Sequence, residues 1–270
     1  MTASLEALDA AVSGWLADAP RPLILGLCGS QGSGKSTVSE GLKARLEGRG
    51  LKAAVLSLDD LYLSKAARAD LAASVHPLFA TRGVPGTHDV ALGVSVLDAI
   101  RAGKAVALPR FDKAADDPFP RAGWPEAPAG LDVLIFEGWS VGARPQPGAD
   151  LADPVNALER DEDAEGIWRE AVNTALGGPY TDLFARLDRL VLLAAPGFEI
   201  VQRWRTEQEH GLRRALEAEG RSGSAVMADD QIVRFIQHYE RLTRHILAEM
   251  PARADLTLSL DETRSLKAAA

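Results

Sequence analysis

A strand–loop–helix segment near the start of the chain constrains the fold more than any other feature of the sequence. Residues 22–28 form a short apolar run, residues 29–36 read Gly-Ser-Gln-Gly-Ser-Gly-Lys-Ser, and a helical pattern follows over residues 35–46. The spacing G-x-x-x-x-G-K-S lets the backbone curl tightly, with its N–H groups turned inward at the start of a helix whose dipole favours anions. The segment therefore predicts a phosphate-binding loop between a buried strand and a helix.

Each residue of this loop has an expected task. Lys35 would contact the β- and γ-phosphates of a nucleotide, and the Ser36 hydroxyl would bind Mg²⁺. A dinucleotide-binding loop is the weaker interpretation, because Thr37 stands where the third glycine of G-x-G-x-x-G belongs. We therefore expect ATP or GTP to bind with magnesium. The predicted nucleotide-binding residues are Gly29, Ser30, Gln31, Gly32, Ser33, Gly34, Lys35, Ser36 and Thr37.

Continuous apolar runs alternate with helical patterns along the rest of the chain. Such runs are typical of a parallel sheet covered by helices on both faces, so we expect an α/β, doubly wound fold and a single domain over residues 1–270. Further strands are predicted at residues 52–58, 105–108, 131–136, 187–194 and 256–260. Helices are predicted at residues 3–18, 90–100, 167–176, 198–216 and 229–250. Residues 109–130 and 142–154 are expected to be loops, and the acidic run 159–165 a solvated surface segment.

Composition narrows the classes of partner. The chain has 30 Lys and Arg against 38 Asp and Glu, a net charge of −8, which argues against nucleic acid as the main partner. The single cysteine, Cys28, allows no intramolecular disulfide, and no apolar run approaches the ~20 residues that span a bilayer. Glu6 and Asp9 lie where a signal peptide would be basic. We expect a cytoplasmic protein with a small-molecule substrate and no membrane contact; the oligomeric state is left open.

Two carboxylates follow predicted buried strands, and the ligand crevice of an open α/β sheet lies at that edge. Asp59 is the candidate base that takes a proton from a substrate hydroxyl, and it is also a candidate ligand of Mg²⁺. Asp60 would point to the other side of an extended chain, so one of the pair is expected to be structural. Glu137 is the candidate carboxylate on the metal side, directly or through water.

A group of arginines follows the strand predicted at residues 187–194. Arg203 and Arg205, with Arg213 and Arg214 further on, lie on a predicted helix after a Pro-Gly break. This arrangement suits a mobile lid over residues 197–225 whose arginines stabilise charge on a transferred phosphoryl group. Lys35, Asp59, Arg203 and Arg205 are therefore the candidate catalytic residues.

The motifs taken together resemble those of the D-glycerate 3-kinase family, a branch of the superfamily that includes uridine kinase, phosphoribulokinase and pantothenate kinase. The resemblance rests on the phosphate-binding loop and on Ser-Leu-Asp-Asp-Leu-Tyr-Leu at residues 57–63, Arg-Gly-Val-Pro-Gly-Thr-His-Asp at 82–89, Pro-Arg-Phe-Asp-Lys at 109–113, Phe-Glu-Gly-Trp at 136–139 and Arg-Trp-Arg at 203–205. It runs from about residue 23 to about residue 260. It departs from the family at Leu61, where Phe is usual, and over residues 114–128.

This resemblance implies a P-loop kinase fold with a helical lid and transfer of a phosphoryl group from ATP to the 3-hydroxyl of D-glycerate. It also implies that Asp59 is the base and that Arg203 and Arg205 are lid arginines. Independently of the resemblance, the carboxylate of such an acceptor needs a cation beyond Lys35, and Arg82, Arg110 and Lys113 are candidates for it. His88 is a candidate hydrogen-bond partner of the acceptor, although a lone histidine more often has a local structural role. The candidate acceptor-binding residues are Asp59, Tyr62, Arg82, His88, Asp89, Arg110 and Asp112.

Two alternatives stay open on sequence grounds. A related kinase would use another acceptor, such as a nucleoside, pantothenate or a different sugar acid. A P-loop ATPase or GTPase coupled to a partner would hydrolyse nucleotide without an acceptor; a GTP-specific one would carry N-K-x-D, which the sequence lacks.

Overall fold

A mainly parallel β-sheet forms the centre of the computed structural model, which describes residues 2–18, 21–218 and 227–270. The strand order is β10–β9–β8–β1–β7–β2, and only β10 runs antiparallel to its neighbour. The predicted α/β fold with a doubly wound parallel sheet is thus confirmed. The strands are β1 Leu23–Gly29, β2 Ala53–Ser57, β7 Val133–Gly138, β8 Arg189–Ala194, β9 Leu256–Leu260 and β10 Leu266–Ala269.

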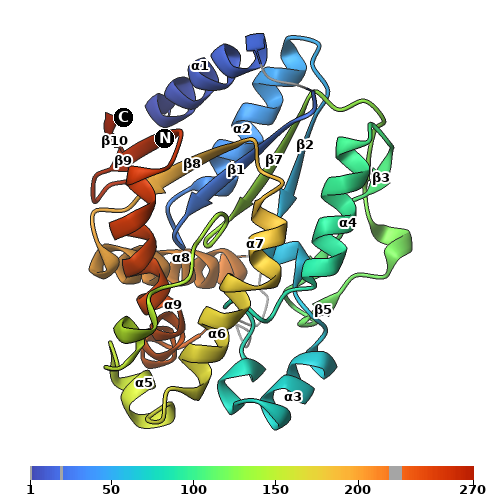
Figure 1. Ribbon diagram of the computed structural model, residues 1–270. Coiled ribbons are helices and arrows are strands. Elements are labelled where there is room, and N and C mark those ends of the chain that lie inside the picture. The colour runs from blue at the N-terminus through green and yellow to red at the C-terminus, as the bar shows by residue number, and fades with distance from the viewer. Residues whose placement is uncertain (1, 19–20, 219–226) are drawn as a thin grey trace.

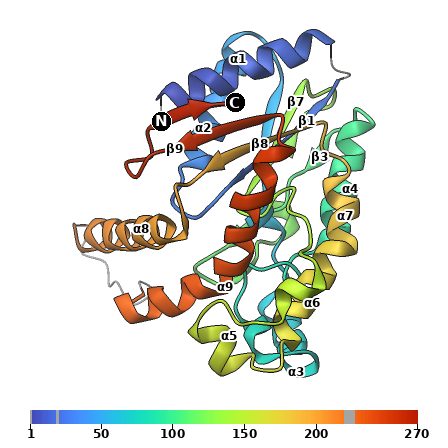
Figure 2. The same cartoon turned by 60° about the vertical axis from the view of Figure 1, so that its left-hand side comes forward.

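Helices cover both faces of this sheet. Figure 2 shows α1 and α2 on one side and α4, α7 and α9 on the other, while α3, α5 and α6 lie below the sheet in Figure 1. In the described parts of the chain, none of the helices is both long and apolar enough to cross a membrane. The α-helices are α1 Thr2–Asp18, α2 Lys35–Gly48, α3 Lys65–Ser74, α4 Val90–Arg101, α5 Ala157–Glu162, α6 Ile167–Gly177, α7 Pro179–Phe184, α8 Phe198–Ala218 and α9 Asp229–Glu249. The 3₁₀ turns are η1 Leu58–Leu61, η2 Pro77–Ala80, η3 Arg121–Gly123, η4 Gly148–Leu151 and η5 Met250–Ala252.

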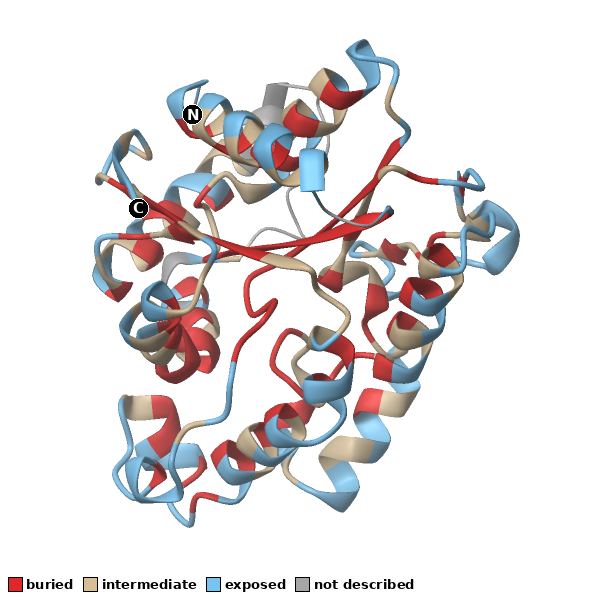
Figure 3. Ribbon diagram, turned by 45° about the horizontal axis from the view of Figure 1, so that its top comes forward, coloured by how far each residue is buried: buried red, intermediate tan, exposed pale blue. Residues whose placement is uncertain are grey.

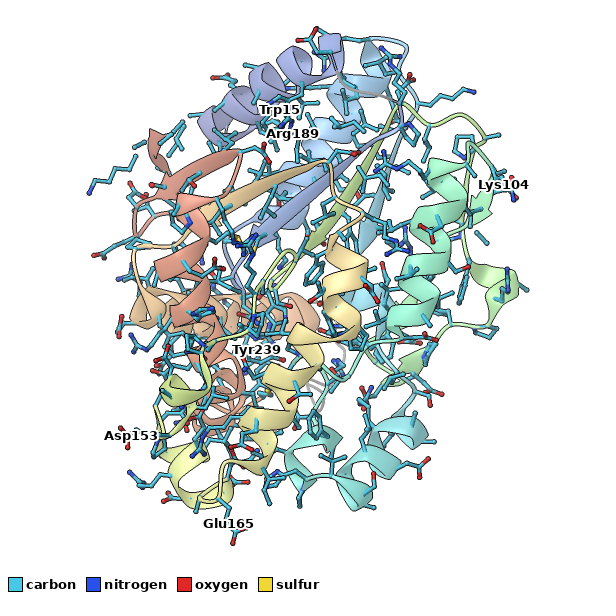
Figure 4. All side chains as sticks on the ribbon, in the orientation of Figure 1. Trp15, Lys104, Asp153, Glu165, Arg189 and Tyr239 are labelled. Carbon is cyan, nitrogen blue, oxygen red and sulfur yellow. The ribbon has the colours of Figure 1, made fainter. Side chains whose placement is uncertain are left out.

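The core lies between these layers. Every residue of β1 and β7 is buried, as expected for apolar strands with helices on both faces (Figure 3). The first helix, α1, packs on the core through Leu8 and Val12, and the Arg189 guanidinium lies 5.7 Å from the centre of the Trp15 ring (Figure 4). The predicted helix over residues 3–18 is thus confirmed.

The structure adds elements to the predicted loop at residues 109–130. The predicted strand at 105–108 is β3 Val106–Ala107, which leaves the main sheet and pairs with β6 Glu126–Ala127. Next to it, β4 Phe111–Asp112 and β5 Asp117–Pro118 form a short hairpin. Helices α3, α5 and α7 and strand β10 were not predicted. Helices α5 and α7 and strand β10 are too short for apolar periodicity to stand out, and α3 buries only Arg68 and so has no apolar stripe.

The prediction that residues 159–165 form a solvated segment is wrong for two of its carboxylates. Glu159 is 0% exposed and accepts hydrogen bonds from Arg241 Nε at 2.8 Å and Nη2 at 2.6 Å. Asp163 is also buried and pairs with Arg169 at 3.1 Å. Each acid has a partner outside the run, and a paired charge can be buried where an unpaired one cannot.

We predict that Glu159→Ala lowers the free energy of unfolding by about 3–5 kcal/mol, because Arg241 then keeps a buried charge without its partner. Urea denaturation measures this loss. The control is Asp161→Ala, because the Asp161 side chain is 59% exposed. We expect this variant to lower the free energy of unfolding by no more than about 0.5 kcal/mol. Equal losses in the two variants would contradict the prediction.

Candidate active site

Two adjoining cavities lie where the strands of the sheet end. We call the first the loop cavity and the second the Asp59 cavity. The loop cavity, about 470 Å³, is lined by Gly32, Gly34, Lys35, Ser36, Thr37, Glu207, Gln208 and Arg264. The Asp59 cavity, about 120 Å³, is lined by Gln31, Lys35, Asp59, Tyr62, Arg82, Lys113, Trp139, Arg205, Phe235 and Tyr239. Lys35 lines both, so the two cavities meet at this residue.

The phosphate-binding loop has the backbone that its glycines predict. Gly32 and Gly34 have φ angles of 75° and 88°, which favour glycine, and α2 begins directly after Gly34. The first N–H groups of a helix have no acceptor within it, so they are free to bind an anion. Within the described residues, the buried Ser30 Oγ, Ser33 Oγ and Gln31 Oε1 also lack hydrogen-bond partners. The loop therefore offers unsatisfied polar groups to a ligand.

Glu137 joins this loop to the next strand. The Ser36 hydroxyl, in the first turn of α2, donates a hydrogen bond of 3.1 Å to Glu137 Oε1 at the end of β7. Glu137 is 5% exposed, and its Oε2 has no partner in the part of the chain that the structure describes. Mg²⁺ is usually held by one or two carboxylates together with phosphate oxygens and water. The hydroxyl and the free carboxylate oxygen therefore fit the predicted Mg²⁺.

Asp59 lies in the 3₁₀ turn η1 that follows β2. Its Oδ1 accepts a hydrogen bond from the Tyr62 hydroxyl at 2.7 Å, and its Oδ2 one from Lys113 Nζ at 2.6 Å. Burial alone would raise the pKa of Asp59, but the charges of Lys113 and Lys35 and these two hydrogen bonds hold it well below the ordinary value. Asp59 is therefore ionised and paired. Its roles as base and as metal ligand stay predictions.

Asp60 has a separate task. It was expected on an extended chain, but η1 turns it toward the β4–β5 hairpin, where Arg110 Nη1 donates to its Oδ2 at 2.8 Å and the Phe111 N–H to its Oδ1 at 3.0 Å. Burial raises the pKa of Asp60, against the opposing charge of Arg110. Of the two neighbouring aspartates, Asp59 lines the cavity and Asp60 holds the hairpin.

Tyr62 is held in place by His88 behind it. The two rings stack with centroids 4.7 Å apart, and His88 Nδ1 is hydrogen-bonded to the Tyr180 hydroxyl. Burial lowers the pKa of His88 to about 3, so the imidazole is neutral at pH 7. His88 supports Tyr62 and does not line the Asp59 cavity; its predicted contact with an acceptor stays a prediction.

Besides His88, four of the residues predicted to contact the acceptor or the phosphoryl group lie outside both cavities. Asp89 caps α4 by accepting from the Leu92 N–H. Arg110 is bound to Asp60, Asp112 accepts the N–H groups of the turn at residues 114–115, and Arg203 pairs with Glu262 at 3.0 Å. Their contacts with an acceptor or a phosphoryl group stay predictions, because in this conformation their polar groups are engaged elsewhere.

Two arginines do line the Asp59 cavity. Arg82 pairs with Asp116. Arg205, on α8, pairs with Glu209, and its buried Nε has no partner among the described residues. Two further arginines of the predicted lid have other partners: Arg213 donates to the Met227 carbonyl and Arg214 to the His210 carbonyl of its own helix. Part of that lid, residues 219–225, lies outside the described residues, so its movement stays a prediction.

Arg264 is a site residue that sequence analysis missed. It lies between β9 and β10, and its Nε donates to the Gly32 carbonyl at 2.7 Å. Its guanidinium carbon lies 5.1 Å from the centre of the Trp204 ring, and Nη2 pairs with Glu207 at 2.7 Å. No motif surrounds it, so only the fold could reveal that it lines the loop cavity.

Comparisons with known proteins agree on one family. The family described as "Phosphoribulokinase / Uridine kinase family" matches residues 24–169. The chain is 36% identical over 230 residues to an uncharacterized kinase of Schizosaccharomyces pombe, a match that covers 81% of this chain and 79% of that protein. It is 30% identical over 262 residues to the chloroplastic D-glycerate 3-kinase of Arabidopsis thaliana, covering 90% of this chain and 54% of that longer protein.

A solved structure shares the fold. The D-glycerate 3-kinase from Cryptococcus neoformans superposes with a TM-score of 0.81 at 24% identity and covers 99% of both chains. At this identity the likeness concerns the fold.

We predict that Gly32→Ala destabilises the protein more than Gly50→Ala. Both glycines have a positive φ, 75° and 79°, so each substitution costs about 1–2 kcal/mol in backbone strain. A Cβ on Gly32 would also lie 2.7 Å from Trp204 Cβ, whereas one on Gly50 would meet nothing within 4 Å. We therefore expect Gly32→Ala to lower the free energy of unfolding by about 1–3 kcal/mol more than Gly50→Ala, as measured by denaturant unfolding. Equal losses would show that the loop can move away from Trp204.

Proposed function

Because the chain belongs to the phosphoribulokinase/uridine kinase family, we propose that this P-loop kinase transfers the γ-phosphoryl group of ATP to the 3-hydroxyl of D-glycerate. The products would be 3-phosphoglycerate and ADP. The observation that carries the proposal is the Asp59 cavity, a small, cation-lined space that meets the loop cavity at Lys35.

The size and charge of this cavity favour a small anionic acceptor. Drug-sized ligands occupy pockets of about 300–1,000 Å³, whereas the Asp59 cavity measures about 120 Å³, which favours a three-carbon acid over a nucleoside. Its walls carry Arg82, Lys113 and Arg205 in addition to Lys35, and these are suitable partners for a carboxylate. The relatedness to a D-glycerate 3-kinase of Arabidopsis thaliana supports the same acceptor.

The loop cavity would hold the triphosphate. The N–H groups at the start of α2 would bind the phosphate oxygens, and Lys35, which faces both cavities, would neutralise charge on the transferred group. Ser36 and Glu137 would hold Mg²⁺, which neutralises charge on the β- and γ-phosphates. Arg205, whose buried Nε has no partner among the described residues, would donate to an equatorial phosphoryl oxygen.

Phosphoryl transfer depends mainly on the position of the acceptor hydroxyl and on stabilisation of the charge on the transferred group. The acceptor oxygen forms a bond to Pγ, the bond from Pγ to the bridging oxygen breaks, and ADP leaves with the bonding electrons. Asp59 would take the proton of the acceptor hydroxyl. The Tyr62 hydroxyl orients the carboxylate through its hydrogen bond to Oδ1, and burial together with the nearby Asp59 charge raises the pKa of Tyr62, so it stays a donor. Trp139, Phe235 and Tyr239 wall the cavity and limit the entry of water.

A coupled assay of ADP release tests the acceptor. We expect turnover with D-glycerate and little with uridine, pantothenate or water, because the cavity is small and cationic. Turnover of a nucleoside or of pantothenate without turnover of D-glycerate would overturn the glycerate assignment in favour of a related kinase. ADP release that no acceptor accelerates would favour a partner-coupled ATPase.

For Asp59→Asn we predict a fall in kcat of ~10²–10⁴-fold, because the amide cannot accept the hydroxyl proton. Affinity for ATP should change little, since Asp59 does not line the loop cavity. Steady-state kinetics and an ATP titration measure the two effects, with Asp70→Asn, an exposed position on α3, as the control. An unchanged kcat in Asp59→Asn would remove Asp59 from the role of base.

A further inference from the structure

Asp59 is already engaged before any acceptor arrives. Lys113 Nζ lies 2.6 Å from Oδ2, the carboxylate oxygen that the Tyr62 hydrogen bond leaves free. A hydroxyl that approaches this oxygen has to compete with a charged ammonium donor, and charge-assisted hydrogen bonds are the stronger ones. The Lys113–Asp59 pair would therefore oppose proton transfer from a hydroxyl to Asp59 in the free enzyme.

The fold fixes the backbone beside Lys113 on both sides. On one side, Asp60 accepts from Arg110 and from the Phe111 N–H. On the other, Asp116, which has a φ of 58°, pairs with both Arg68 and Arg82. The side chain of Arg68 is 1% exposed, so this anchor is buried on the protein side. The β4–β5 hairpin is thus a fixed support.

Of the paired cations that line the Asp59 cavity within the described residues, Lys113 is the most exposed. Its side chain is 60% exposed and ends in a flexible four-carbon stem, whereas Arg82 and Arg205 are 30% and 18% exposed and pair with Asp116 and Glu209. Asp116 and Glu209 do not line the Asp59 cavity, whereas Asp59, the partner of Lys113, forms part of its wall. Of the cations paired around this cavity within the described chain, Lys113 can therefore change partner with the least rearrangement.

We propose that Lys113 selects acceptors that carry an anionic group and admits them to Asp59. In the free enzyme its ammonium group covers Asp59. The carboxylate of an incoming acceptor forms an ion pair with the Lys113 ammonium group. Asp59 Oδ2 then becomes available to the acceptor's hydroxyl. Water and neutral alcohols carry no anionic group that could replace Asp59 as the partner of Lys113. The Lys113–Asp59 ion pair therefore persists in their presence, and hydrolysis of ATP without an acceptor is suppressed. This inference rests on the proposed kinase function and adds to it the residue that recognises the acceptor's charge.

The test compares D-glycerate with glycerol, which has the same carbon chain and a hydroxymethyl group in place of the carboxylate. Kinetics are measured for the wild type, Lys113→Met and Lys113→Arg, with ADP release also followed without an acceptor. Lys104→Met is the matched control, because Lys104 is exposed on the outer side of the molecule, away from Tyr239 and the Asp59 cavity (Figure 4).

For Lys113→Met we expect the KM for D-glycerate to rise roughly tenfold to a hundredfold, as for the loss of one charged hydrogen bond. We expect the preference for D-glycerate over glycerol in kcat/KM to fall by a similar factor, and ADP release without acceptor to increase. Lys113→Arg should restore most of the preference, and Lys104→Met should behave like the wild type. An unchanged preference in Lys113→Met, or an acceptor-free rate that does not increase, would overturn the proposal.

These results are separable from a failure of the proposed function. If the wild type uses an acid other than D-glycerate, the glycerate assignment fails, and the same variants are compared on that acid and its neutral alcohol. If the wild type uses D-glycerate and Lys113→Met keeps the full preference for it, the inference on Lys113 fails alone. A wild type that uses only neutral acceptors overturns both.

Discussion

The hydrogen bond between Ser36 and Glu137 is the contact on which the rest of the site depends. It ties the first turn of α2 to the end of β7, the strand that lies between β1 and β2. The register of the sheet places Glu137 level with Leu27 of β1 and Ser57 of β2. Glu137 therefore lies at the same height along the strands as the residues that precede the phosphate-binding loop and η1. Because backbone hydrogen bonds fix that level, strand pairing is what makes the two cavities meet at Lys35.

This dependence explains which parts the sequence alone could predict. The phosphate-binding loop is a local motif, and the positions of Asp59 and Glu137 follow from the rule that parallel strands end at the same edge of a sheet. The sequence favoured Asp59 over Asp60 as the base, but an extended chain with alternating side chains did not show which groups either carboxylate contacts. The chain turns into a 3₁₀ helix at Leu58, and the partners of each carboxylate decide its task.

The residues that contact these side chains could not be predicted. A local sequence pattern indicates which face of a helix or strand a side chain occupies, but it does not show which distant residue packs against that face. Glu159 looked solvated within an acidic run until the fold placed Arg241, 82 residues away, against it. Arg264 reaches the carbonyl of Gly32 from 232 residues away. The supports of the β4–β5 hairpin likewise come from distant segments, so no pattern around Lys113 could show that it covers Asp59.

The charge balance of the Asp59 cavity connects these contacts to the chemistry. A cluster of cations is costly to bury without counter-charges, and here carboxylates of the chain itself supply them. Arg82 and Arg205 are paired with acids that do not line the cavity. A ligand that took Arg205 would leave the buried Glu209 without this partner, and one that took Arg82 would leave Asp116 with Arg68 alone. The carboxylate that Lys113 would leave is Asp59, which keeps the hydrogen bond from Tyr62 and gains one from the acceptor hydroxyl. An exchange of ion-pair partners would therefore cost least free energy at Lys113, and there it would also expose Asp59, the expected base.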